Sequence, residues 1–209
     1  MPDKVRLIPQ AALNGIATGL CLMSFFTLVW TGIAYGGLYS GGYWVLLLIF
    51  PAFCILFIVN AIRLFRIAKY FPASTSPDDI AREKSTGKWF GIIFGAEGLG
   101  IVIAINVVVN LGHPELTVPV IALVVGLHFF PLAWLFRRSI DYYLASYSTL
   151  VAVAAMILSY GKFFSQNETI AFTGIGIAIA ISAYGFYMFI RGRKARAALQ
   201  SNAENALVR

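Results

Sequence analysis

Residues 89–110 read WFGIIFGAEGLGIVIAINVVVN, and this stretch decides the class of the protein. Glu97 is its only charged residue, and apart from Asn106 and Asn110 its other positions are apolar or small. A helix needs about 20 such residues to cross a hydrocarbon core of about 30 Å. The stretch therefore predicts a membrane-spanning helix with one acidic side chain inside it.

Five other stretches are apolar over a similar length. The six predicted spans lie at about 11–35, 43–65, 89–110, 117–136, 142–160 and 169–190. They lack the alternation of a membrane β-barrel. The whole chain of 209 residues is 59% hydrophobic and 12% charged, whereas soluble domains are about 25% charged. We therefore expect an all-α, polytopic membrane protein, with one integral domain built as a six-transmembrane-helix bundle.

The basic residues are distributed unevenly between the two ends of these spans. Lys162 is on one side, and the rest of the 16 Lys and Arg residues are on the side of both termini. Loops rich in Lys and Arg stay in the cytoplasm, so we expect cytoplasmic termini, a cytoplasmic loop at 66–88 and a cytoplasmic tail at 191–209. The net charge of +7 then indicates binding to anionic lipid head groups at that face, and no binding of nucleic acid.

Two local patterns refine this side of the protein. Ser76-Pro77-Asp78-Asp79 is typical of a helix start, with a hydroxyl cap, a proline and two acids in the first turn. It predicts a short helix at the membrane surface that reaches about Glu83. The tail from Arg191 is expected to extend the sixth helix and then fray.

Glu97 is the strongest candidate for a functional residue. An acid at the centre of a spanning helix costs about 2.5–3.5 kcal/mol on insertion scales, so it rarely faces lipid. One interpretation is an ion- or proton-binding site. The other is a structural acid that only ties helices together through hydrogen bonds.

His128 is the histidine that lies within a predicted span, and its depth matches that of Glu97. Glu97 is eight residues from Trp89, and His128 is eight residues from Phe136. Both therefore lie about 12 Å from the cytoplasmic ends of their helices, which are consecutive and antiparallel. A Glu97–His128 pair is one expectation. The alternative is a hydrogen bond from His128 to the Leu127 carbonyl, which Pro131 leaves without its helical partner.

Other polar residues and prolines fall within or near the spans. The cavity-lining candidates are Asn14, Asn106, Tyr184 and Tyr187; the same side chains can instead bond between helices or anchor at the interface. Pro51 and Pro131 predict kinks in the second and fourth helices. Arg137 and Asp141, four residues apart, predict a local ion pair or a helix cap.

Glycines at helical spacing occur in the third and sixth spans. Gly91 and Gly95 have the spacing that allows close helix approach, and Gly174 and Gly176 lie among small residues. We expect these faces to pack tightly inside one subunit. A homo-oligomer seam is the alternative.

The segment Gly126-Leu127-His128-Phe129-Phe130-Pro131-Leu132-Ala133 resembles a motif of small bacterial six-helix integral membrane proteins of unassigned function. The resemblance implies that His128 and Pro131 are family features, and it carries no activity with it. We accordingly expect a multi-pass protein of the bacterial inner (plasma) membrane.

These observations predict a small channel or secondary transporter that uses Glu97 and His128 for an ion or small solute. One alternative is a non-catalytic module that binds a protein partner through the 66–88 loop or the tail. The other is a membrane-embedded enzyme with a lipid-like substrate, for which no nucleophile is apparent. The sequence has no His-Glu-x-x-His, Cys-x-x-Cys or Walker A motif, so no cofactor and no metal are expected.

Overall fold

The computed structural model describes residues 7–39, 43–73 and 76–207, and no strand occurs among them. Lys4, Arg6 and Arg209, which contributed to the predicted orientation, lie outside the described residues. The α-helices are α1 (Gln10–Leu38), α2 (Ile49–Ile67), α3 (Pro77–Asn110), α4 (Thr117–Phe136), α5 (Ser139–Tyr160) and α6 (Gln166–Leu207). Three 3₁₀ helices are η2 (Tyr43–Leu48), η3 (Ala68–Tyr70) and η4 (Pro114–Leu116).

Six helical stretches among the described residues are long and apolar enough to cross a membrane. They coincide with the six predicted spans, so the all-helical class and the presence of six helices long and apolar enough to span a membrane are confirmed. The fourth span is predicted to the residue, as Thr117–Phe136. α4 ends there because Arg137 turns into the left-handed conformation with φ 53°, which stops helix propagation.

The segment between the second and third spans differs from the expectation. The predicted start is right, because α3 begins at Pro77 with Asp78 and Asp79 in its first turn. The helix then continues without a break to Asn110, so the expected separate short helix that ends near Glu83 is wrong, and residues from Pro77 onward form the first part of α3. No proline follows Pro77 in this segment, and Gly87 costs only about 1 kcal/mol in a helix.

Two further features concern helix ends. Pro51 is the third residue of α2 and follows the 3₁₀ turn η2. In the first turn its missing N–H breaks no helical bond, and the kink predicted in the second helix stays a prediction. Pro131 does lie inside α4. The tail continues α6 as a helix as far as Leu207, as expected for its first part.

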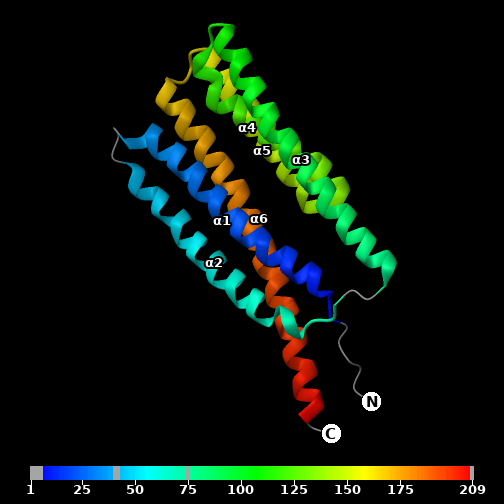
Figure 1. The fold of residues 1–209 in the computed structure, drawn as a ribbon. Coiled ribbons are helices and arrows are strands. Elements are labelled where there is room, and N and C mark those ends of the chain that lie inside the picture. The colour runs from blue at the N-terminus through cyan, green and yellow to red at the C-terminus, as the bar shows by residue number, and fades with distance from the viewer. Residues whose placement is uncertain (1–6, 40–42, 74–75, 208–209) are drawn as a thin grey trace.

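The α-helices form two groups. Figure 1 shows α1, α2 and α6 on one side and α3, α4 and α5 on the other. α6 joins the groups by packing against α5 and α4, whereas α1 and α3 do not pack along one another. We call the end of the bundle where α1 begins and α6 ends the terminal end.

α1 and α6 share the most extensive interface of the bundle. Glycines on α6 allow the helices to approach closely: a Cβ added at Gly174 would lie 2.6 Å from the backbone nitrogen of Ala34. One at Gly185 would overlap the ring of Phe57 on α2. α1 and α2 are also tied by reciprocal contacts between Ser24 and Cys54, each 3.3 Å from its side chain to the other's carbonyl.

Candidate functional site

Glu97 is one of the few positions where α3 turns a polar group toward the protein. Most of α3 is exposed, but the side chain of Glu97 is only 9% exposed. It points to α4, the one helix against which α3 packs extensively. Because lipid cannot hydrate a carboxylate, this orientation is the one expected for an intramembrane acid.

His128 on α4 meets Glu97 directly. Its Nδ1 lies 3.3 Å from Glu97 Oε1, and its side chain is 10% exposed. The predicted proximity of the two residues is therefore confirmed. The contact is an ion-pair distance without the alignment of a hydrogen bond.

The alternative interpretation, a hydrogen bond from His128 to the Leu127 carbonyl, is not seen among the described residues. The backbone group that interacts with His128 belongs to Val125, in the preceding turn of α4. Aromatic rings hold the imidazole in place from two sides. The Phe94 ring meets it edge-on with centroids 6.4 Å apart, and the Phe129 ring lies at 4.3 Å.

The pair opens onto a cavity of about 710 Å³ between the two helix groups. α1, α3, α4 and α6 all contribute to its walls, which are mostly apolar. Small-molecule sites commonly have about 300–1,000 Å³ and a few polar groups on apolar walls. Phe26 of α1 and Phe94 of α3 approach across it with ring centroids 5.9 Å apart. The cavity thus has the size and lining of a ligand site, and the Glu97–His128 pair is part of its wall.

A second polar cluster lines the cavity nearer the terminal end. Arg138 Nη1 donates to the Tyr184 hydroxyl at 3.2 Å, and Tyr184 stacks on Tyr187 with an interplanar angle of 13°. Asp141 is fully buried and interacts electrostatically with Tyr184 and Arg138. The predicted partner of Asp141 was Arg137; the left-handed turn at Arg137 makes Arg138 the partner instead.

Of the four predicted cavity-lining residues, the structure brings two to the cavity. Tyr184 and Tyr187 line it, and Asn14 and Asn106 do not. Asn106 is exposed and its Nδ2 donates to the Val102 carbonyl of its own helix at 2.7 Å. In the same way, Asn110 Nδ2 donates to the Asn106 carbonyl at 2.8 Å. An amide that bonds one turn back on its own helix needs no polar cavity, which explains the wrong assignment.

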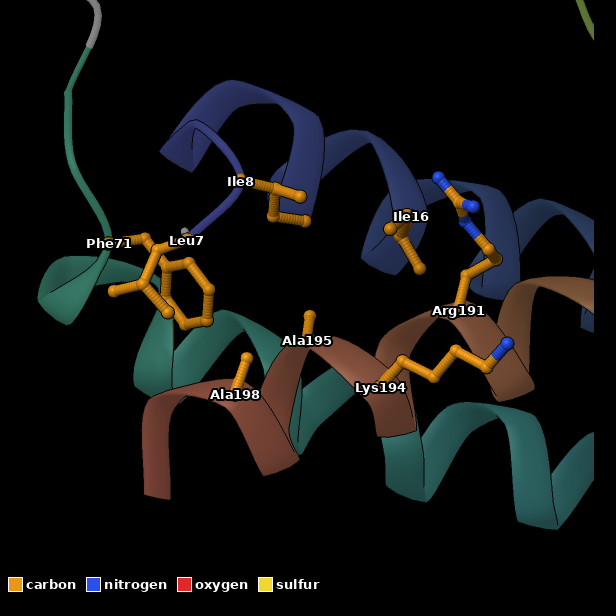
Figure 2. A pocket seen from close by; sticks show the side chains of 8 residues that line it. All are labelled: Leu7, Ile8, Ile16, Phe71, Arg191, Lys194, Ala195 and Ala198. Atoms are coloured by element: carbon orange, nitrogen blue, oxygen red, sulfur yellow. The ribbon is translucent and has the colours of Figure 1, made fainter. Parts of the chain in front are cut away.

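A smaller cavity of about 200 Å³ lies at the terminal end, between the start of α1, Phe71 and α6. Figure 2 shows Arg191 leaving α6 toward α1 beside Ile16, with Lys194 one turn further along α6. Ile8, Ile16 and Arg191 line both cavities. Arg191 therefore stands where the two cavities meet. From the sequence, Arg138 and Arg191 were expected to set the orientation and to bind anionic lipid head groups at the surface, because no local pattern shows which basic side chains turn toward a cavity.

A second Glu–His pair lies outside the cavity and can be compared with the Glu97–His128 pair. His113 Nδ1 lies 2.9 Å from Glu115 Oε1 at the end opposite the terminal end, and both side chains are over 30% exposed, at 39% and 34%. The two residues are two apart in one turn. Among the described residues no three His, Cys, Asp or Glu side chains are grouped as metal ligands would be.

Comparisons with known proteins give no relative: no family model, no curated protein and no solved structure matches this chain. The resemblance of residues 126–133 to small bacterial membrane proteins stays a prediction. The function must therefore be inferred from the site itself.

Proposed function

We propose that this chain is a multi-pass membrane transporter for a small solute, and that Glu97 and His128 form its ion- or proton-binding site. The observation that carries the proposal is the 3.3 Å Glu97–His128 contact on the wall of a cavity of about 710 Å³. Ionisable residues inside membrane spans usually mark ion and proton pathways.

The arrangement of the helices supports transport over a purely structural acid. A cavity between two helix groups is the form that transporters use for alternating access, because one group can rock against the other. α1 and α3 flank the cavity and meet through the Phe26–Phe94 ring contact, with few close backbone contacts between them, so the groups can change their separation there. A structural acid would need no cavity beside it.

Proteoliposomes containing a pH-sensitive dye test the proposal. The wild-type protein should carry a proton flux, and Glu97→Gln, which keeps the shape and removes the charge, should abolish it. Glu115→Gln is the matched control, because it removes the acid of the other Glu–His pair, which lies outside the cavity. Both variants should elute as folded protein.

Loss of flux in both variants, or in neither, would contradict the assignment to Glu97. If the wild type moves neither protons nor common ions, the alternative of a non-catalytic partner module takes precedence. The exposed face of α3, where a Cβ at Gly91, Gly95 or Gly98 would meet no atom within 4 Å, favours that alternative over a membrane enzyme.

The proposal includes an orientation with both termini in the cytoplasm of a bacterial cell. In a variant without Cys21 and Cys54, a cysteine at Ser76 should react with an impermeant thiol reagent only after permeabilisation. A cysteine at Gln166 should react in intact cells. Reaction of Ser76→Cys from outside would reverse the orientation and leave the Glu97 site untouched.

A further inference from the structure

The lining of the large cavity changes character along its length. On the side of the Glu97–His128 pair away from the terminal end it is apolar, with Val29, Trp30, Ile33, Ile101 and Ile121. On the terminal side its lining contains Arg82, Arg138 and Arg191. A ligand that fits the whole cavity must therefore be apolar at one end and polar at the other.

The polar end of the cavity carries excess positive charge. Its three arginines face two acids in the same lining, Glu83 and Glu97, and the buried Asp141 beside Arg138 is a third acid close to them. Lys194 adds a fourth cation from the smaller cavity, which Arg191 joins to the large one. Guanidinium groups favour carboxylate and phosphate because they donate paired hydrogen bonds in a plane.

One of these cations is already held in position. Arg138 donates to Tyr184, which is only 4% exposed, and Tyr184 is supported by stacking on Tyr187. An arginine fixed in this way loses less conformational entropy when it binds an anion. The polar end is thus prepared for an anionic group.

The side of the cavity between α1 and α3 offers an entrance from the lipid. The α1 wall there includes the small residues Ala12 and Gly15 beside the larger Leu22 and Phe26, and α3 makes few close backbone contacts with α1. An apolar chain can enter beside Ala12 and Gly15, on the terminal side of the Phe26–Phe94 ring contact. A ligand with such a chain would reach the cavity from the bilayer and not only from water.

We propose that the cavity binds an amphipathic anion, with its apolar chain toward Trp30 and its anionic head group between Arg138 and Arg191. The inference rests on the proposed function in one respect, which is that this anion would be the transported solute. Binding of the anion to the cavity does not depend on whether the protein carries a proton flux. The Glu97–His128 pair then lies beside the chain just above the head group, where a proton can be exchanged as the ligand enters or leaves.

Quenching of Trp30 fluorescence tests the proposal in the full-length protein. Trp44, Trp89 and Trp134 are replaced by Phe, and the protein is reconstituted in zwitterionic vesicles. Dodecanoate brominated at the end of its chain should quench Trp30 saturably. Unbrominated dodecyl phosphate should relieve the quenching, and dodecyltrimethylammonium at the same concentration should not. Relief by inorganic phosphate alone would mean that the site binds the head group without needing the chain, and would overturn the proposal.

Variants identify the residues that hold the head group. Arg138→Gln and Arg191→Gln should each weaken binding of the brominated chain by about tenfold, the equivalent of one lost charge-assisted contact. Arg193→Gln is the matched control, because Arg193 is on the same helix, is exposed and lines neither cavity. It should bind as the wild type does.

Two outcomes would overturn the inference without relying on a variant that folds poorly. Equal competition by the anionic and cationic amphiphiles in the wild-type protein would remove the charge selectivity. Quenching that rises linearly without saturation would mean that the chain only partitions into lipid. If quenching is saturable and selective for anions but the protein carries no proton flux, the transport proposal alone is overturned. If the protein carries a proton flux but quenching is not selective, the proposed ligand class alone is overturned.

Discussion

Helices α3 and α6 have similar glycine-rich sequences and opposite surroundings. Of the most apolar 18 residues in each helix, 11% are buried in α3 and 61% in α6. A Cβ at Gly174 of α6 would collide with the backbone of α1, whereas one at Gly95 of α3 would meet nothing within 4 Å. The same small residues thus pack a core in one helix and leave an open face in the other. Our expectation of tight packing within the subunit is right for α6 and wrong for α3.

Polar side chains on the two helices differ in the same way. Tyr184 of α6 accepts from Arg138, which lies 46 residues away in the turn before α5. Asn106 of α3 bonds to the carbonyl of Val102 in its own helix. The polar side chain of α6 therefore bonds to another part of the bundle, whereas that of α3 bonds within its own helix. This difference is consistent with α6 as part of a fixed core and α3 as a helix that borders the cavity.

The largest effect should come from Gly174→Ala. The added methyl group would lie 2.6 Å from the backbone nitrogen of Ala34, so α1 and α6 must separate. Overpacking of this kind costs about 1–3 kcal/mol. Thermal unfolding in detergent should show a lower midpoint than wild type. An unchanged midpoint would mean that the α1–α6 interface is looser than its geometry indicates.

Tyr184→Phe should have a smaller effect on stability. The substitution removes the hydroxyl that accepts from Arg138 and interacts with buried Asp141, for a loss of about 1–2 kcal/mol. The same unfolding assay measures it. Tyr187→Phe is the control, since the ring stacking is kept and no Arg138 bond is lost; a drop of equal size in both variants would point to the rings and not to the hydroxyl.

Gly95→Ala in α3 should not destabilise the protein at all. The methyl group has free space, and alanine is favoured over glycine in helices by up to about 1 kcal/mol. The midpoint should stay the same or rise slightly. A clear drop would show that the open face of α3 is covered in the detergent-solubilised protein, and the contrast with α6 would then fail.

The smallest expected effect is a difference in the width of the distance distributions between spin labels on different helices. In a variant without Cys21 and Cys54, spin labels at Phe25 and Leu99 report on α1 relative to α3, and labels at Phe25 and Ile179 report on α1 relative to α6. All three label sites are exposed. We expect a broader distribution for the first pair, because few buried contacts hold α3. Equal widths would argue against relative movement of the two helix groups.

The sequence was sufficient for features that depend on length and depth along one helix. Six apolar stretches gave six helices, and equal offsets of Glu97 and His128 from their helix ends gave their contact. Which face of a helix turns inward depends on packing with distant segments. For that reason Asn106 was assigned to a cavity it does not line, and Arg138 was not recognised as the partner of Tyr184.

The continuous course of α3 gives it the mechanics of a lever. Its 34 residues span about 51 Å, some 20 Å more than the hydrocarbon core of about 30 Å. Past its middle, on the side of Asn110, Gly100 approaches Val124 of α4 closely, at 3.2 Å from an added Cβ, and this point can serve as a fulcrum. A force on the Pro77 end would then be converted into the largest displacement at the cavity mouth and almost none near Gly100. Load applied at the Pro77 end would therefore change the width of the cavity and leave the Glu97–His128 contact, three residues from Gly100, in place.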